Sequence, residues 1–346
     1  MTDQKLKVGI AGYGIVGKRR RHFIDENPYF KTVAVCDQVF EGQKKFPSDV
    51  KYFSHYTDLL KEPLDILFVC IPNYIASEIT VAGLEKGLHV FCEKPPGRNV
   101  ADIKKVVAAE RKQSHLKLKY GFNHRYHDSV RDALNIIRSG EFGKIINMRG
   151  IYGKSKVVPF IGGWRSERRY AGGGILLDQG IHLLDLMQLF CGEFTEVKSY
   201  VSNNFWNHDV EDNVYALMQD KQGRIATIHS SATQWQHRFS LDIALEKGFI
   251  VLSGILSSSK SYGEEELLIG RRDDSGNGTM REETIRYIED HSWKLEIDEF
   301  ADAIMGKSEI VNGRSQDALS VMKLVYRIYS ADSSWKEKFQ IEDPDL

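Results

Sequence analysis

Three residues, in two separate parts of the chain, have the side-chain types needed for acid–base chemistry on a hydroxyl group: Lys94, Asp178 and His182. An imidazole titrates close to neutral pH and is therefore an effective base, while a lysine ammonium stabilises negative charge that develops on an oxygen. Asp178 and His182 are four residues apart, so they share one face if their segment is helical. We predict that these three residues form the catalytic set and that no metal ion takes part.

Each of these residues also has an ordinary structural explanation. A lysine after an apolar run is usually a surface charge, and a lone histidine in an apolar helix is usually a buried, hydrogen-bonded residue. Catalysis is favoured here because Lys94 follows the strand-like run at 89–92, and parallel sheets bind ligands beyond the carboxyl ends of their strands. The three glycines at 172–174, just before the helix of Asp178 and His182, support the same interpretation.

A glycine-rich stretch near the start of the chain predicts a dinucleotide site. It reads Gly12-Tyr13-Gly14-Ile15-Val16-Gly17 and follows the apolar run at 7–11. The first glycine permits a tight turn, the second lets the backbone approach a pyrophosphate, and the third lets the next helix pack closely. The start of that helix offers free N–H groups to the phosphates. The residues expected to contact the cofactor are Gly12, Tyr13, Gly14, Ile15, Val16, Gly17, Asp37, Pro72, Asn73, Glu93 and Lys94.

Asp37 predicts which dinucleotide is bound. It ends a second apolar run, at 32–36, and lies twenty residues after Gly17, the spacing expected for a carboxylate on the adenine ribose. Such a carboxylate accepts from the 2′-hydroxyl of NAD and repels the 2′-phosphate of NADP, so we expect NAD to be preferred over NADP. The basic run at 18–21 is either an additional phosphate contact or a solvated helix face, and we favour the solvated face.

The first third of the chain alternates strand-like and helix-like segments. Apolar runs at 64–71, 89–92 and 117–122 are separated by helical patterns at 75–86 and 101–113. This alternation indicates an α/β domain with a doubly wound parallel sheet, over residues 1–121. A dinucleotide site combined with Lys94, Asp178 and His182 is suited to moving a hydride and a proton together.

The rest of the chain, residues 122–346, predicts a second domain of α+β type. Its strand-like runs are joined by links too short for crossover helices, so antiparallel pairing is expected. An apolar helical pattern at 175–190 carries Asp178 and His182, with Asp185 as an orienting or structural partner. Amphipathic helices are expected at 293–305 and 315–330, packing back near the domain junction.

Five motifs, in order along most of the chain, are similar to those of the glucose–fructose oxidoreductase / inositol dehydrogenase / rhizopine-catabolism family. They are the Gly12–Gly17 turn, Pro72-Asn73, Glu93-Lys94-Pro95, Gly121-Phe122-Asn123-x-Arg125, and Gly172-Gly173-Gly174-x-x-x-Asp178-x-Gly180-x-His182-x-x-Asp185. The resemblance implies a Rossmann domain followed by a domain with a large, mostly antiparallel open sheet. It also implies sugars, polyols or their derivatives as substrates, and a catalytic role for Lys94, Asp178 and His182. The family often has a histidine shortly after Pro-Asn, where this chain reads Tyr74-Ile75-Ala76-Ser77.

Several further residues are candidates for binding the substrate. The loop before the catalytic helix contains Trp164, which could stack on a sugar ring, and Arg165, which could bind a carboxylate or phosphate. A solvated charged loop anchored by one tryptophan explains the same residues equally well. Arg125 and Tyr152 complete the expected substrate-binding set, together with Asp178 and His182.

Composition sets broad limits on function. With 346 residues and 42% hydrophobic residues, two domains with ample cores are expected. A net charge of −1 favours neither nucleic acid nor a membrane as partner. The four cysteines are scattered without a zinc or disulfide pattern, and neither a signal peptide nor a membrane span fits, so we expect a cytoplasmic protein. An open sheet with apolar residues at alternating positions predicts a homodimer or homotetramer.

The leading hypothesis is an NAD(P)-dependent sugar or polyol dehydrogenase. Three alternatives remain open: a glycoside hydrolase that uses tightly held NAD, a nucleotide-sugar or uronate dehydrogenase, and a non-catalytic sugar-sensing regulator. The regulator is disfavoured because a sensor needs no proton relay such as Lys94, Asp178 and His182. The absence of an export signal disfavours the hydrolase, and the arginine-containing loop would suit the nucleotide-sugar or uronate enzyme.

Overall fold

The computed structural model describes residues 5–42, 49–158, 162–257, 261–272, 278–342 and 344. The chain divides into two compact units. The first contains Met1–Phe122 and Trp293–Leu319, and the second contains Asn123–Ser292 and Ser320–Leu346. Each unit is described by itself.

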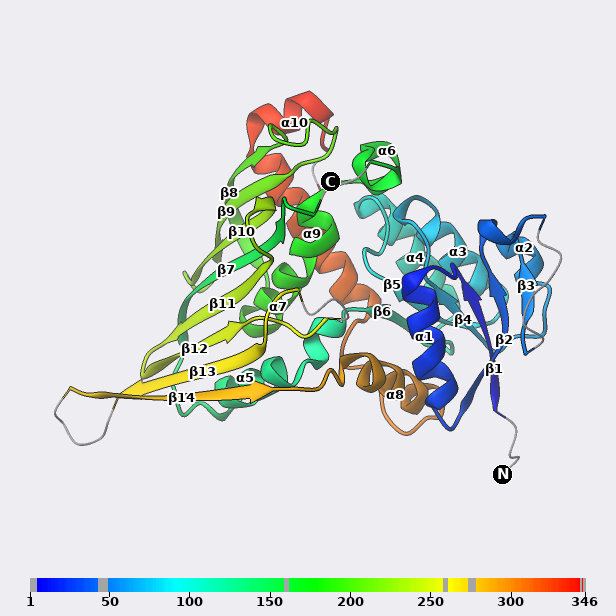
Figure 1. Ribbon diagram of the computed structural model, residues 1–346, viewed down its shortest axis with the longest axis horizontal. Helices are drawn as coiled ribbons and strands as arrows, with labels where there is room; N and C mark the ends of the chain where they lie inside the picture. Colours follow the sequence, from blue (N-terminus) through cyan, green and yellow to red (C-terminus); the bar gives the residue numbers. More distant parts are fainter. Residues whose placement is uncertain are drawn as a thin grey trace. The chain divides into compact units, whose positions relative to one another are not determined.

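The first unit is a Rossmann domain. Within its described residues, six parallel strands lie in the order β3-β2-β1-β4-β5-β6, with helices in the connections (Figure 1). The chain order reverses between β1 and β4, and ligands of such sheets bind beyond the strand ends at that point. The elements are β1 Leu6–Ala11, α1 Ile15–Glu26, β2 Phe30–Cys36, β3 Lys51–Phe53, α2 Tyr56–Leu59, β4 Ile66–Val69, α3 Asn73–Glu85, β5 His89–Glu93, α4 Val100–Lys112 and β6 Leu118–Gly121.

A late helix completes the core of the first unit. The ring of Phe300, on α8 (Ser292–Ile304), packs edge-to-face on the rings of Phe30, Phe68 and Phe91. Residues 293–319 therefore belong to the first unit, whereas the sequence predicts one continuous second domain over 122–346. The apolar face of α8 is visible in the sequence, but its partner in the core is not.

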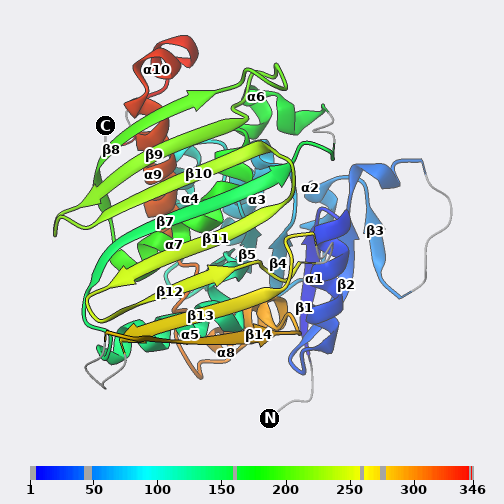
Figure 2. The ribbon, with the colours of Figure 1, turned by 60° about the vertical axis from the view of Figure 1, so that its left-hand side comes forward.

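The second unit is built on a large, mostly antiparallel sheet. Within the described residues, eight strands lie in the order β14-β13-β12-β11-β7-β10-β9-β8, and the pairing of β7 with β10 is parallel (Figure 2). Helices α5, α7 and α9 lie on one face of this sheet. The elements are α5 Asp128–Ser139, β7 Ile145–Ser155, α6 Arg168–Ala171, α7 Ile181–Cys191, β8 Phe194–Ser202, β9 Asn213–Asp220, β10 Ile225–Gln234, β11 Arg238–Leu245, β12 Gly248–Ser253, β13 Glu265–Arg272, β14 Met280–Tyr287, α9 Ser315–Ala331 and α10 Ser333–Phe339.

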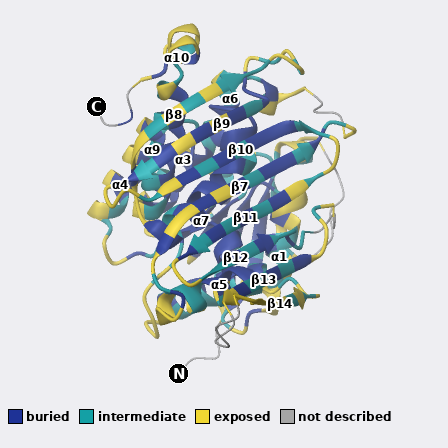
Figure 3. Cartoon of the chain, turned by 90° about the vertical axis from the view of Figure 1, so that its left-hand side faces the viewer, coloured by how far each residue is buried: buried dark blue, intermediate teal, exposed yellow. Residues whose placement is uncertain are grey.

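The other face of the sheet has no described helix over it. Along β9, Val214, Ala216 and Met218 are buried toward the helices, while Tyr215 and Leu217 are exposed on the outer face (Figure 3). This two-residue alternation is the normal side-chain period of a strand. The outer face therefore presents apolar side chains to solvent in the single chain.

Some elements have no clear sequence signal. Strand β14 is an edge strand of mostly charged, exposed residues, so it lacks the apolar alternation that marks the other strands. Helix α5 follows directly on the motif at 121–125 and ends at Gly140, which has a positive φ of 72°.

Across the described residues, none of the helices combines the length and the apolar character needed to span a bilayer.

Candidate active site

The glycine-rich turn has the local geometry of a phosphate cradle. A Cβ at Gly12, where φ is +90°, would lie 2.1 Å from the carbonyl oxygen of Cys70, and a Cβ at Gly17 would lie 2.0 Å from the oxygen of Gly12. Both glycines are thus required by close backbone approaches. A Cβ at Gly14 would instead enter open space at the start of α1, where Ile15 is 82% exposed. The turn and the free N–H groups of the helix fit a dinucleotide pyrophosphate.

Asp37 follows β2 and is fixed beside this turn. Its Oδ2 accepts from the backbone N–H of Tyr13 at 2.8 Å, and its Oδ1 accepts from that of Val39 at 3.1 Å. The carboxylate is therefore held at the carboxyl end of β2, next to the strand that leads into the glycine turn. This is the position from which a carboxylate reaches an adenine ribose.

The basic run at 18–21 is not a uniformly solvated face. Arg20 is fully buried, and its guanidinium pairs with Glu93 at 2.5 Å and with Glu296 at 2.6 Å. The guanidinium also lies between two rings, 4.4 Å from the centre of Phe91 and 4.3 Å from that of Trp293. The expectation of a solvated face is thus wrong for Arg20, because the buried Glu296 and the partly buried Glu93 pair with its guanidinium.

This buried cluster anchors the loop that carries Lys94. Glu93 ends β5, and its bond to Arg20 ties the residue before Lys94 to helix α1. Burial raises the pKa of Glu296 from its ordinary 4.5 to about 7, although Arg20 and Lys119 act in the opposite direction. Lys94 therefore follows a strand end whose backbone and last side chain are both fixed.

In the second unit, a buried carboxylate organises the start of the helix that carries Asp178 and His182. Glu211 accepts from the backbone N–H of Gly174 at 2.7 Å and from that of Leu176 at 3.0 Å. The hydroxyl of Tyr329 donates to the same carboxylate at 2.6 Å. A Cβ at Gly174 would lie 2.1 Å from the backbone oxygen of Glu211, so the glycine allows this approach. Burial raises the pKa of Glu211, and Arg168 opposes that shift.

This helix begins with a π-helical turn, Leu176–Gly180, and continues as α7. Asp178 lies in the wider turn and His182 in the first turn of α7, so the predicted regular spacing of one α-turn is locally expanded. The close approach of Gly180 to Ser230 of β10 accompanies this change, since a Cβ at Gly180 would lie 2.7 Å from the serine Oγ. Single π-turns of this kind are frequent at functional sites.

The described contacts gather several predicted residues around this helix. His182 is buried, and its ring stacks on that of His124, which in turn contacts the hydroxyl of Tyr152 at 3.1 Å. The hydroxyl of Tyr262 donates to Gln179, the neighbour of Asp178, at 2.9 Å. Burial raises the pKa of Tyr152 well above its ordinary value, and the nearby Tyr262 and Asp178 add to the shift.

Arg125 and the loop residues have different surroundings. Arg125 is buried and donates to both oxygens of Asp185, at 2.7 and 2.6 Å. Arg165 is exposed, with its guanidinium 4.3 Å from the ring centre of the half-buried Trp164. Among the predicted residues, Asp178, His182, Tyr152 and Arg125 thus belong to one local framework of the second unit.

Sequence reasoning missed the supporting residues Arg20, Glu296 and Glu211. Each carries a charge that, in the sequence, is indistinguishable from a surface charge. The sequence points to Glu211 only indirectly. The glycines at 172–174 indicate that another backbone segment approaches this stretch closely, but they do not show which segment it is. His124 is a further supporting residue, and it occupies the open position of the motif at 121–125.

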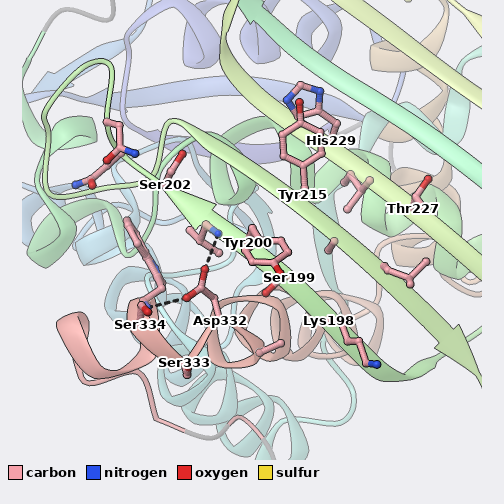
Figure 4. A pocket seen from close by; sticks show the side chains of 18 of the residues that line it. Lys198, Ser199, Tyr200, Ser202, Tyr215, Thr227, His229, Asp332, Ser333 and Ser334 are labelled. Atoms are coloured by element: carbon pink, nitrogen blue, oxygen red, sulfur yellow. Dashed lines mark hydrogen bonds between the residues drawn. The ribbon is translucent and has the colours of Figure 1, made fainter.

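A large hollow lies away from these residues, on the outer face of the second unit's sheet. Its volume is about 1130 Å³, and it is lined by residues of β7 to β10 and of the segment around α10 (Figure 4). Tyr215 and His229 stack there with ring centres 3.9 Å apart, and Asp332 accepts from the backbone N–H of Val201. Helix α7 packs on the opposite face, since a Cβ at Gly150 would meet Leu183 and Met187. The hollow therefore belongs to a different surface.

Comparison with known proteins agrees with this arrangement. Residues 6–122 match the model of an oxidoreductase family with an NAD-binding Rossmann fold, and residues 130–251 match the GFO/IDH/MocA C-terminal domain. The chain belongs to the GFO/IDH/MocA oxidoreductase family. It is an oxidoreductase with an NAD-binding Rossmann domain.

The curated relatives are moderately similar. Inositol 2-dehydrogenase of Salmonella paratyphi B is 26% identical over 73% of this chain and 76% of that protein. D-glucoside 3-dehydrogenase of Escherichia coli is 28% identical over 67% of this chain and 71% of that protein. A protein provisionally assigned as the UDP-kanosamine synthase oxidoreductase subunit of Amycolatopsis mediterranei is 31% identical, and the chain spans 57% of its length.

Solved structures share the fold. A levoglucosan dehydrogenase in complex with NADH and L-sorbose superposes with a TM-score of 0.83 at 19% identity, covering 96% of this chain and 98% of that one. The Rossmann domain and the mostly antiparallel open sheet, both expected from the motifs, are confirmed.

Proposed function

We propose that the protein is an NAD-dependent dehydrogenase that oxidises a hydroxyl group of a sugar, a polyol or a related derivative. The observation that carries this proposal is the framework around His182, in which Glu211 fixes the helix start and His124, itself in contact with Tyr152, stacks on the imidazole. Relatives named as dehydrogenases of inositol and of glucosides support the substrate class.

The roles of the catalytic residues follow from their chemistry. His182 takes the proton of the substrate hydroxyl, because an imidazole is basic at neutral pH. Lys94, as an ammonium, donates a hydrogen bond to the same oxygen and stabilises its developing alkoxide character. Asp178 holds either the substrate or His182 in the position needed for proton transfer. The hydride leaves the carbon that bears this oxygen, so that a C–H bond and an O–H bond are replaced by a C=O bond.

The cofactor is held by the residues at the strand ends of the first unit. When bound, its nicotinamide C4 accepts the hydride. Gly12 to Gly17 bind the pyrophosphate, Asp37 binds the adenine ribose, and Pro72, Asn73 and Glu93 shape the strand ends next to Lys94. The two hydrogen bonds that hold the Asp37 carboxylate support a preference for NAD over NADP.

The substrate-binding residues divide into two groups. We assign contact with the substrate to Asp178, His182 and Tyr152, and to Trp164 and Arg165 of the preceding loop. We assign Arg125 a positioning role: its guanidinium donates to both carboxylate oxygens of Asp185 and thereby fixes that side chain.

Replacement of the two proton-handling residues tests this mechanism. Lys94→Ala and His182→Ala should each lower turnover by about 10²- to 10⁴-fold. NAD binding by His182→Ala should stay close to that of the wild type, because the cofactor contacts lie in the other unit. Exposed Lys86→Ala is the control for Lys94→Ala and should have no effect. Near-wild-type turnover of His182→Ala across the pH range would rule out His182 as the base.

We also propose that the outer face of the second unit's sheet is covered by another copy of the chain. Tyr200, Tyr215 and Leu217 are exposed on this face, and so is Ile225. An apolar sheet face of this kind is usually buried in a symmetric interface. The expected assembly is a homodimer or homotetramer.

A further inference from the structure

The imidazole of His182 lies face to face with a second imidazole. The ring centres of His182 and His124 are 3.7 Å apart, and the ring planes differ by 11°. Both residues are buried, with exposed fractions of 4% and 7%. Parallel rings at this distance contact each other over their whole faces, so a charge on one is felt strongly by the other.

Hydrogen bonds at both ends of His124 fix its orientation. Its Nε2 lies 3.1 Å from the hydroxyl of Tyr152, and its Nδ1 lies 3.2 Å from Oδ1 of Asn123. The amide nitrogen of Asn123 donates to Ser292 at 3.1 Å, which leaves Oδ1 to accept from the histidine. The hydroxyl of Tyr152 can donate to Nε2 of a neutral His124 or accept from Nε2–H of a protonated one. Because Oδ1 of Asn123 and the hydroxyl oxygen of Tyr152 can both accept, the network also holds His124 in its protonated form.

Two stacked imidazoles do not readily carry two positive charges. Like charges at short range disfavour the second protonation, so such a pair titrates in two separated steps. The pair takes up one proton first, and the second only at a lower pH. A proton on His124 therefore lowers the basicity of His182.

The other charged groups near the stack are largely compensated. The ring of His127, 5.5 Å from that of His124, is paired with Glu265 at 2.7 Å. Asp185, one turn after His182, is paired with Arg125. Asp178, four residues before His182, favours the protonated imidazole. A proton on His124 opposes protonation of His182, while Tyr152 and Tyr262 stay neutral with raised pKa values.

We propose that His124 is a positioning residue that stacks on His182 and keeps it in the neutral, proton-accepting form. This inference rests on the proposed role of His182 as the base. It predicts that the working pH range of the enzyme is set by the stacked pair and not by His182 alone. The stack also fixes the plane of the imidazole, and hence the direction in which it can accept a proton.

Titration of the histidine C2–H signals by NMR tests the proposal directly. Loss of the His182 signal in His182→Gln assigns that signal. In His124→Phe, which keeps a flat ring but removes the second titrating site, the pKa of His182 should rise by about one unit. His124→Gln, which keeps a hydrogen-bonding side chain, should raise it as well and replaces the first variant if that one does not fold. The acidic limb of the kcat/KM profile should move to higher pH in parallel.

A matched control is available in the same unit. His229 stacks on Tyr215 with ring centres 3.9 Å apart, but on the outer face of the sheet. His229→Phe should leave the pKa of His182 unchanged. An unchanged pKa of His182 in both His124 variants would overturn the proposal, even if His182 is the base. Full activity of His182→Ala would instead contradict the proposed function, while the NMR titration would still report on the stack.

Discussion

At the residue scale, the proposed recognition of the adenine end of the cofactor rests on Asp37. Its carboxylate is held by backbone N–H groups of Tyr13 and Val39, beside the glycine turn. A 2′-phosphate placed there would meet a fixed negative charge.

Replacing this carboxylate should therefore change cofactor choice. The wild type should bind NAD more tightly than NADP, and Asp37→Ser should narrow the difference by about tenfold or more, the scale of one lost charge repulsion. Equilibrium binding of both cofactors by fluorescence titration measures this. Asp65→Ser is a control for a carboxylate elsewhere in the same unit. Equal affinity of the wild type for NAD and NADP would contradict the assignment.

The sequence was informative about residues whose role leaves a pattern. Gly12, Gly14 and Gly17 have a spacing that a phosphate turn requires, and Asp37 lies at a defined distance from them. The partners of such residues leave no pattern, because Arg20 and Glu296 are 276 positions apart in the chain. Their pairing depends on α8 joining the first unit, which hydrophobic periodicity alone cannot reveal.

At the element scale, the start of the helix that carries Asp178 and His182 depends on the space that Gly174 leaves free. A Cβ there would lie 2.1 Å from the backbone oxygen of Glu211, and backbone cannot move as a flexible side chain can. The same segment supplies the carboxylate that binds the N–H groups of Gly174 and Leu176.

Gly174→Ala should thus destabilise the protein by about 1–3 kcal/mol, the usual cost of overpacking. It should also lower kcat, because the helix that carries Asp178 and His182 is displaced. Urea denaturation and steady-state kinetics measure the two effects. Gly162→Ala is the matched control, since a Cβ at Gly162 would lie 3.5 Å from Oγ of Ser166, an ordinary van der Waals distance. Equal stability of both variants would contradict this account of the glycine triplet.

Burial of Glu296 beside Arg20 predicts a pH dependence of stability. Burial raises the pKa of Glu296 from 4.5 to about 7. A raised carboxyl pKa means that folding favours the protonated form of Glu296. What this group contributes to the free energy of unfolding is therefore complete below pH 4.5 and is lost as the pH rises toward 7.

The variant Glu296→Gln should remove this dependence, because its amide stays neutral. Between about pH 4.5 and 7, the free energy of unfolding of the wild type should fall relative to that of Glu296→Gln. Urea denaturation of both proteins across this range measures the difference. The prediction fails if the difference in the free energy of unfolding between the two proteins stays constant with pH, or grows in favour of the wild type. Glu296 would then be ionised in the folded protein across this pH range.

At the scale of the whole molecule, the uncovered sheet face predicts self-association. Leu217→Lys places a charge on this face and should weaken the assembly by at least tenfold, because burying an unpaired charge is costly. Val311→Lys is the control, since Val311 is an exposed apolar residue of the first unit. Light scattering at micromolar concentration gives the mass of each protein. A monomeric wild type would contradict the proposed interface.

The two-unit architecture was largely predictable, and its exceptions have physical causes. Alternating strands and helices indicated the Rossmann unit, and short links indicated antiparallel strands after residue 122. The edge strand β14 was missed because its exposed, charged residues lack apolar alternation. The π-helical turn at Leu176–Gly180 was missed because periodicity over 175–190 is compatible with a regular helix; the wider turn depends on contacts such as Gly180 with Ser230.

The measurement that tests the central claim most directly is cofactor reduction by the wild-type protein. Purified protein is incubated with NAD and with a panel of sugars, polyols and nucleotide sugars, and NADH formation is followed by absorbance. The account predicts that at least one sugar or polyol gives NADH formation that His182→Ala lacks. Release of sugar from aryl glycosides without net formation of NADH would contradict it, as would sugar binding with no turnover in either direction.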